Sequence, residues 1–212
     1  MIITKQKNFM DILRRIGSKP VFLVGCSECA TLCKSGGKEE VLAIKESLIK
    51  NKIPVSGWVV LEPACHLMND KRMLKKYSKE LSESTKILVL ACGNGIQTLN
   101  KLFPEKEIIA GTDTLFLGEI SRVNEFFKQC LLCGECILDD FDGFCPVTRC
   151  PKSMLNGPCG GSSNGKCEIN SEIECVWDCI YQVFKKKGKL DVLTFIQKPK
   201  DWSKALENKR RI

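Results

Sequence analysis

Histidine and long apolar runs are what this sequence has least of. Only one of the 212 residues is a histidine, His66, and aromatic residues make up 7%. So little histidine disfavours zinc sites that combine Cys and His, and it leaves few groups for proton transfer near neutral pH. No stretch approaches the roughly 18 apolar residues of a membrane span, and residues 1–20 lack the apolar run of a signal peptide. We therefore expect a cytoplasmic protein without a membrane span.

Cysteine, in contrast, is abundant, with 14 residues. In a reducing compartment, clustered thiols more often hold metal than form disulfides. With histidine nearly absent, the expected sites are all-thiolate: zinc bound by four cysteines, or iron-sulfur clusters. No nucleophile, base and acid accompany the thiols in a recognisable arrangement, so we predict no catalytic residue.

The positive charge of the chain is concentrated near its C-terminal end. Residues 185–212 contain ten Lys or Arg and three acidic residues, a net +7 of the total +8. A solvated tail and a tail that docks onto an acidic partner protein both fit this pattern. Aromatic residues are too sparse in the tail to predict nucleic acid as a partner.

Apolar runs alternate with helix-like stretches through residues 1–124, which predicts an α/β domain with an open parallel sheet and flanking helices. Residues 125–187 predict a small Cys-rich, loop-rich iron-sulfur module, with a helix-like segment at 172–187. Residues 188–212 predict an extended basic tail, with Trp202 as its candidate anchor. The strands are expected at 21–24, 55–61, 87–90 and, more weakly, 107–110, and the helices within 1–17, 38–51, 69–82 and 94–103.

A first group of thiols follows three of the predicted strands. Because the carboxyl ends of parallel strands share one edge of a sheet, these thiols should meet there. Cys33, four residues after Cys29, could point at the same place from a helix. Cys65 and Cys92 could instead be ordinary buried thiols, and His66 could be a surface residue or lie beside a cluster. The five candidates for four ligand positions are Cys26, Cys29, Cys33, Cys65 and Cys92.

A second group of seven thiols begins with the triplet Cys130, Cys133 and Cys136. This spacing opens the ferredoxin pattern, but eight residues rather than three separate it from the next Cys-Pro pair, so a ferredoxin fold is not implied. Seven thiols are one short of two complete sites. Cys175 and Cys179, four residues apart, are expected on the core face of a helix. The candidate ligands here are Cys130, Cys133, Cys136, Cys145, Cys150, Cys159 and Cys167.

The motifs CLLCGECILDDFDGFCPVTRCPKSMLNGPCGG and GKCEI, with the earlier GCSECATLCKSGGKEEV and ACGNGIQT, resemble the MetV subunit family. That family is also described as the methylenetetrahydrofolate reductase C-terminal domain. The resemblance implies a redox subunit that itself does no folate chemistry and carries two [4Fe-4S] clusters on the two cysteine groups, with an additional zinc site left open.

The same resemblance implies two protein partners. One is a MetF-type flavoprotein, which holds the flavin and the folate site. The other is reduced ferredoxin or another electron-donor protein. Electrons would pass through this chain to the flavin, for reduction of methylenetetrahydrofolate to methyltetrahydrofolate. Two alternatives stay open: a structural zinc-binding scaffold of the same kind of complex, and a self-sufficient enzyme with a flavin or substrate beside His66.

Overall fold

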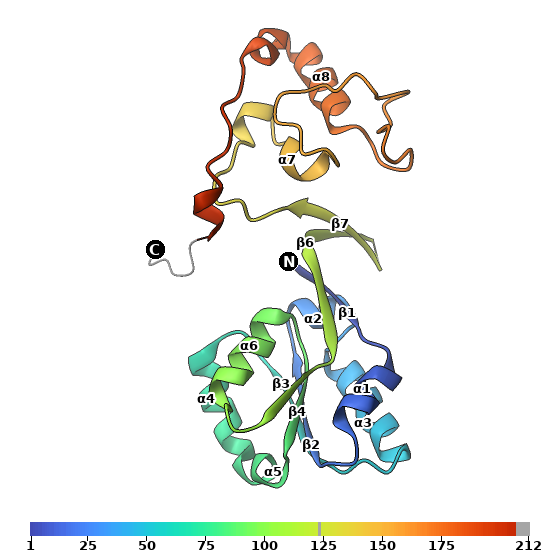
Figure 1. The fold of residues 1–212 in the computed structure, drawn as a ribbon, viewed down its shortest axis with the longest axis vertical. Coiled ribbons are helices and arrows are strands. Elements are labelled where there is room, and N and C mark those ends of the chain that lie inside the picture. Colours follow the sequence, from blue (N-terminus) through green and yellow to red (C-terminus); the bar gives the residue numbers. More distant parts are fainter. Residues whose placement is uncertain (123, 207–212) are drawn as a thin grey trace. The chain divides into compact units, whose positions relative to one another are not determined.

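The computed structural model describes residues 1–122 and 124–206 of the chain (Figure 1). These residues divide into two compact units. The first unit comprises Met1–Phe116 with Arg122–Asn124, and the second comprises Leu117–Ser121 with Glu125–Ile212. Each unit is described by itself below.

The first unit is built on a parallel four-stranded sheet, as the alternating pattern predicted. Its strand order is β3-β2-β4-β5. The two central strands pair in register, with Val24 opposite Val89. The prediction of an α/β domain with an open parallel sheet is thereby confirmed. The strands are β2 (Val21–Cys26), β3 (Val55–Leu61), β4 (Lys86–Leu90) and β5 (Glu107–Ala110).

Helices cover both faces of this sheet (Figure 1). Along β2, Leu23 packs in one apolar cluster with α1 and α3, while Phe22 and Val24 pack in another with α4, α5 and α6. Successive side chains of a strand point to opposite faces, so a strand buried on both sides is apolar throughout. The helices are α1 (Phe9–Ile16), α3 (Lys38–Lys50), α4 (Leu67–Leu74), α5 (Ser78–Glu83) and α6 (Gly93–Leu102).

Two segments of the first unit differ from the sequence-based expectation. The helix expected within residues 1–17 is preceded by a strand, β1 (Ile2–Gln6), whose five residues are too few to show a clear period. The helix expected over 69–82 is interrupted by a 3-10 turn at Lys75–Tyr77. This turn lets the Tyr77 ring pack edge-on against Phe22, with ring centroids 5.9 Å apart.

The second unit has little regular structure and a small apolar cluster. Its longest helix, α8 (Val176–Lys187), contributes Trp177, Ile180 and Phe184 to that cluster. Strands β6 and β7 are neighbours in one sheet. The remaining elements are β6 (Thr112–Arg122), β7 (Glu125–Cys130), α7 (Pro146–Arg149) and 3-10 segments at Asp139–Phe141, Leu190–Thr194 and Trp202–Leu206.

The tail expected to be extended over residues 188–212 is only partly so. Two 3-10 segments interrupt it, and residues 207–212 lie outside the described part.

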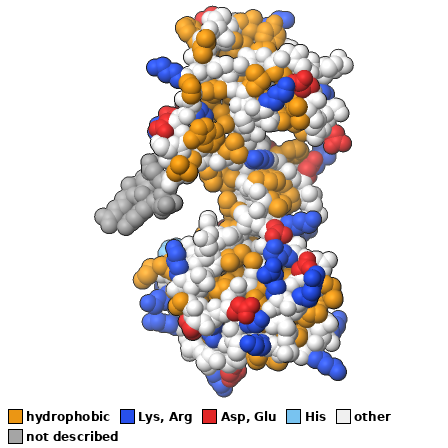
Figure 2. Space-filling model, viewed as in Figure 1, with side chains coloured by type: hydrophobic (Ala, Val, Ile, Leu, Met, Phe, Trp, Pro, Cys, Tyr) orange, Lys and Arg blue, Asp and Glu red, His pale blue; other side chains and the backbone are white. Residues whose placement is uncertain are grey.

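No helix in the described ranges is long and apolar enough to cross a membrane. On the face shown in Figure 2, Lys and Arg side chains of the first unit are scattered among acidic and apolar ones and form no continuous patch.

Candidate metal centres

The thiols of the first unit lie where its strands end. Cys26 is the last residue of β2, and Cys29 begins the four-residue helix α2 (Cys29–Leu32). Cys65 follows β3 by four residues, and Cys92 is the N-cap of α6, directly after β4. Because β2, β3 and β4 are parallel neighbours, these residues come to one edge of the sheet.

The Cys65 thiol is influenced by the thiols of Cys92 and Cys26. Burial raises the pKa of the Cys65 thiol, and the negative charges of Cys92 and Cys26 raise it further. Like charges in close proximity disfavour ionisation of each member, and a bound cation would reverse that preference. The sheet edge therefore gathers thiols that a positive centre could stabilise as thiolates.

Glycines allow the close approach that brings these segments together. The Cys26 N–H donates to the Gly36 oxygen at 2.9 Å, and a Cβ on Gly25 would lie 2.6 Å from that oxygen. In α6, a Cβ on Gly95 would lie 2.9 Å from the Ala91 Cβ and 3.1 Å from the Ala64 oxygen. The first turn of α6, which carries Cys92, can thus pack against the segment that carries Cys65.

His66 has a structural role at the start of α4. Its Nδ1 accepts a hydrogen bond from the backbone N–H of Asn69 at 3.2 Å, which caps the helix. One turn further on, Asp70 is fully buried, and neither of its carboxylate oxygens has a hydrogen-bond partner within the described residues. Burial raises the Asp70 pKa to about 6, although nearby His66 counteracts the shift.

Cys33 lies in a different environment from the other thiols of its group. It is buried, and its Sγ accepts a hydrogen bond from the Thr4 N–H at 3.5 Å and lies 3.8 Å from the Ile2 oxygen, both on β1. Cys33 does lie one helical turn after Cys29, as its spacing predicted, since the Cys33 N–H donates to the Cys29 oxygen at 3.0 Å. The side chain nevertheless packs against β1.

In the second unit, the triplet begins at the last residue of β7, Cys130, and continues with Cys133 and Cys136 in a tight loop. Leu132 and Gly134 have positive φ angles of 56° and 77°. The Cys130 Sγ accepts a hydrogen bond from the Leu132 N–H at 3.3 Å, which turns the thiol into the loop. The prediction that this loop holds a cluster stays a prediction.

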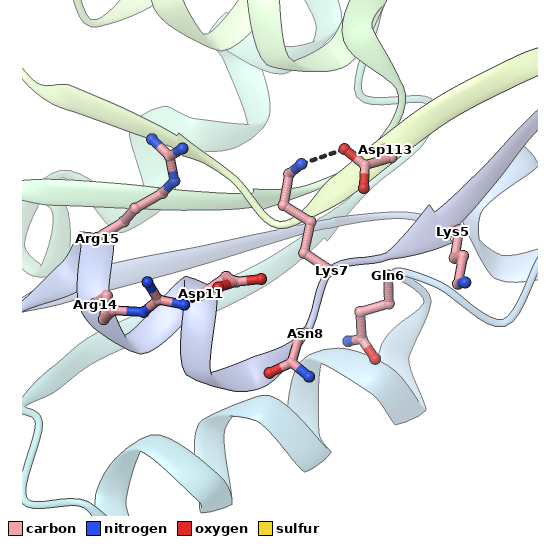
Figure 3. A pocket seen from close by; sticks show the side chains of 8 residues that line it. All are labelled: Lys5, Gln6, Lys7, Asn8, Asp11, Arg14, Arg15 and Asp113. Atoms are coloured by element: carbon pink, nitrogen blue, oxygen red, sulfur yellow. Dashed lines mark hydrogen bonds and ion pairs between the residues drawn. The ribbon is translucent and has the colours of Figure 1, made fainter.

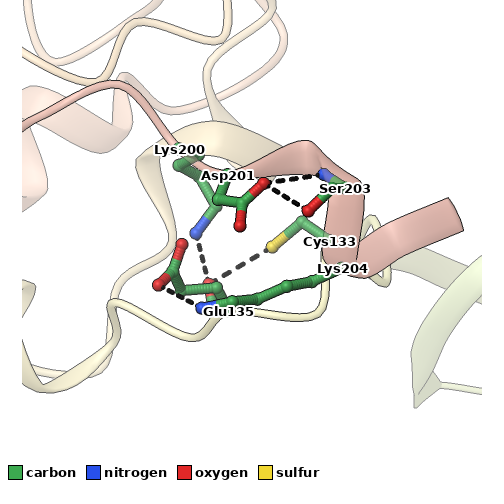
Figure 4. Close-up of polar contacts among 6 residues, drawn as sticks. All are labelled: Cys133, Glu135, Lys200, Asp201, Ser203 and Lys204. Atoms are coloured by element: carbon green, nitrogen blue, oxygen red, sulfur yellow. Dashed lines mark hydrogen bonds and ion pairs between the residues drawn. The ribbon is translucent and has the colours of Figure 1, made fainter. Parts of the chain in front are cut away.

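Part of the C-terminal tail packs onto this loop (Figure 4). The Lys204 Nζ donates to Glu135 Oε1 at 2.7 Å, and this contact lowers the Glu135 pKa. Lys200 donates to the Glu135 backbone oxygen. A Cβ on Gly134 would lie 2.9 Å from the Lys204 backbone, so only glycine permits the approach. The tail is mostly exposed here, as expected for a solvated tail, but Lys200 and Lys204 contact the loop.

Four further thiols of the second unit line one small cavity. Cys150 and Cys175 are buried in its wall, Cys167 is half-buried and Cys159 is exposed. Cys175, expected on the core face of a helix, is the N-cap of α8 and does belong to the apolar cluster. It lines the cavity as well, and nothing in the helical spacing indicated that. Cys179, one turn later, is absent from the cavity lining.

The remaining candidate, Cys145, is the N-cap of α7, with Pro146 at the first helical position. Its Sγ lies 3.5 Å from the Thr148 Oγ1. Within residues 1–122 and 124–206, no three Cys, His, Asp or Glu side chains are gathered closely enough to hold a metal ion as they stand. The donor set is nevertheless the one that iron-sulfur clusters and zinc require, namely thiols in groups on loops and strand ends.

A larger pocket of about 790 Å³ in the first unit contains no thiol (Figure 3). It is lined by charged residues of β1 and α1, and two ion pairs partly neutralise it: Lys7 with Asp113, and Arg14 with Asp11. Its polar lining offers no redox or nucleophilic group. We therefore place the candidate site at the cysteines.

Comparisons with known proteins agree with the cysteine-rich motifs. Residues 109–203 match the family model described as Methylene-tetrahydrofolate reductase C terminal. Searches of the curated proteins and of the solved structures gave no significant match. The matched segment contains all of the thiols from Cys130 to Cys179. Residues 109–203 are thus similar to the methylenetetrahydrofolate reductase C-terminal family, as the motifs of the chain had indicated.

Proposed function

We propose that this chain is an iron-sulfur electron-transfer subunit of a methylenetetrahydrofolate reductase. In this role it passes electrons from a reduced carrier, such as ferredoxin, to the flavin of a MetF-type partner. The family match supports the link to the reductase. The observation that supports the redox part is that Cys26, Cys65 and Cys92 follow three neighbouring parallel strands at one sheet edge.

We assign two four-thiol groups to the proposed clusters. At the sheet edge, Cys29 completes a set with the three strand-end thiols, because Cys33 is directed toward β1. In the second unit, Cys145 completes a set with the triplet. Bound [4Fe-4S] clusters would supply one-electron transfer at both places.

The chain itself positions and shields these sites. Gly25, Gly36 and Gly95 allow the close backbone approaches at the sheet edge. At the triplet loop, Lys200 and Lys204 place positive charge beside Glu135, and a positive charge near a reducible centre favours its reduced form. We assign the reduction of folate to the partner's flavin, because hydride transfer is chemistry that the flavin itself supplies.

The test uses the chain co-expressed anaerobically with its MetF-type partner. We expect a brown complex with about eight iron atoms per chain, bleached by dithionite and active in flavin reduction by reduced ferredoxin. Cys65→Ser should remove about four iron atoms and lower the rate of flavin reduction at least about tenfold, and Cys133→Ser should do the same at the other set.

The matched control is Cys33→Ser, which alters a thiol of the same segment that packs against β1. We expect it to retain the full iron content and the electron paramagnetic resonance signal of the unmodified complex. A colourless complex that contains zinc in place of iron would refute the electron-transfer role and favour the scaffold alternative. Iron loss in Cys33→Ser would refute the division of thiols at the sheet edge.

A further inference from the structure

We propose that the exposed side of α4 and of the turn that follows it is the docking surface for the electron donor, an acidic one-electron carrier protein. This α4 surface comprises two exposed apolar residues and five cations within Leu67–Lys79. The inference rests on the proposed function, because it assigns the place where electrons enter the chain. It uses only residues of the first unit.

Positive charge is dense and uncompensated on the α4 surface. Thirteen residues contain five cations, and all five are exposed. None of them takes part in an ion pair with another described residue. The one acidic residue of the stretch, Asp70, is fully buried. An acidic protein is the partner that such a field attracts. The cations are Lys71, Arg72, Lys75, Lys76 and Lys79.

The α4 surface begins beside the thiols of the sheet edge. Cys65, a proposed cluster ligand, is exposed and lies two residues before Leu67. Leu67 and Met68 form the first turn of α4 and are 43% and 69% exposed. Exposed apolar side chains with a charged rim are typical of a protein interface, and Met is enriched there. A protein bound at this turn would therefore contact the surface next to Cys65.

An apolar groove extends the α4 surface. Helices α4 and α6 lie side by side (Figure 1), and the groove between them and α5 has a volume of about 420 Å³. Lys71 and Lys75, one helical turn apart, stand among its lining residues, and Glu105 is the single acidic one. An apolar side chain flanked by carboxylates fits this combination. Its apolar lining is Leu74, Leu81, Leu102 and Phe103.

The composition of the α4 surface favours a transient partner over a permanent subunit. Permanent interfaces are large and mainly apolar, whereas complexes for electron transfer are small and depend on charge for fast encounter. Here two exposed apolar side chains accompany five cations. A carrier has to bind and leave at every turnover, and attraction between opposite charges speeds its arrival without a large contact area. We therefore assign the surface to the donor and not to the MetF-type partner.

The experiment measures binding of a small acidic ferredoxin to the anaerobically prepared complex of this chain with its MetF-type partner. At about 0.1 M salt, Lys71→Glu combined with Lys75→Glu should raise the Kd for ferredoxin at least about tenfold. The iron content should stay the same, because neither lysine is a candidate ligand. At about 0.5 M salt the difference from the unmodified complex should shrink, since salt screens exposed charges.

The matched control is Lys45→Glu combined with Lys50→Glu. It makes the same change of charge on α3, which covers the other face of the sheet. We expect its Kd to stay within about twofold of the unmodified value. Met68→Ala tests the apolar part of the surface and should weaken binding by about threefold at both salt concentrations, because an apolar contact is not screened.

The outcomes separate this inference from the function on which it rests. A complex without redox-active iron would refute the electron-transfer function, and the donor site with it. In a complex that contains the iron, an unchanged Kd in the α4 variant would overturn the α4 surface alone. Equal weakening in the α3 control would do so too, because only total charge would then matter. Loss of the MetF-type partner from the α4 variant would show a subunit interface instead.

Discussion

The first unit buries two layers of apolar side chains against its sheet, with thirteen and eleven residues, whereas the buried cluster of the second unit has seven residues, two of them cysteines. A small apolar cluster contributes little stability, so small domains are usually stabilised by disulfides or bound metal. From this difference we expect the thiols to have different tasks in the two units. In the first, they would be added to a sheet that is stabilised by its own apolar layers; in the second, bound metal would supplement a small core.

The largest expected effect is therefore that of metal removal. We expect a chelator under reducing conditions to leave residues 1–116 resistant to protease while the second unit is cleaved, because metal binding supplies folding free energy to a thiolate site. Limited proteolysis with mass spectrometry of the fragments measures this directly. Equal cleavage of both units would show that their stabilities do not differ in the proposed way.

The next effect tests the packing of the first unit. A Cβ on Gly36 would overlap the Leu90 backbone oxygen, so Gly36→Val should lower the free energy of unfolding by about 3 kcal/mol or more. Gly143→Asn is the control in the second unit: Gly143 has a φ of 88°, and nothing lies within 4 Å of its Cβ position. We expect Gly143→Asn to lower the free energy of unfolding by about 1 kcal/mol or less. Urea denaturation measures both values, and a similar loss of unfolding free energy in the two variants would contradict the packing argument.

A smaller effect comes from the buried Asp70. Its pKa of about 6 in the folded state exceeds its ordinary value of 3.8, so the folded state binds more protons than the unfolded state in that interval. Stability should therefore fall as pH rises from about 4 to 6, and the penalty persists above that range. Asp70→Asn should flatten this dependence and stabilise the protein at pH 7 by about 1 to 3 kcal/mol. Thermal unfolding measured across this pH range would test it, and an unchanged slope would contradict it.

The smallest effect is expected at the exposed contact between the tail and the triplet loop. Lys204→Ala removes the hydrogen bond to Glu135, and exposed ion pairs contribute little to global stability. We expect the unfolding transition to stay the same, while amide hydrogen exchange at residues 131–136 becomes faster. Lys198→Ala, in the same tail, serves as the control. Unchanged exchange in Lys204→Ala would mean that the tail does not order the loop.

Much of the fold could be predicted from the sequence. The strands Val55–Leu61 and Glu107–Ala110 have the bounds that their apolar runs indicated, and helix Lys38–Lys50 differs by one residue. Strand β1 and the interruption at Tyr77 could not be predicted, because both depend on contacts with distant residues. The division of thiols among metal sites stays a prediction.

The sequence by itself determined that the chain has a parallel sheet with flanking helices, and that its cysteines come in two groups along the chain. Apolar runs and cysteine spacing are local properties, and local patterns decide which segments become strands and tight loops. Only the tertiary structure decided that Cys33 packs against β1, that Cys175 lines a cavity with three other thiols, and that Lys204 lies on the triplet loop. Those outcomes depend on how distant backbone segments approach one another, which glycines such as Gly36 and Gly134 permit and no neighbouring residue encodes.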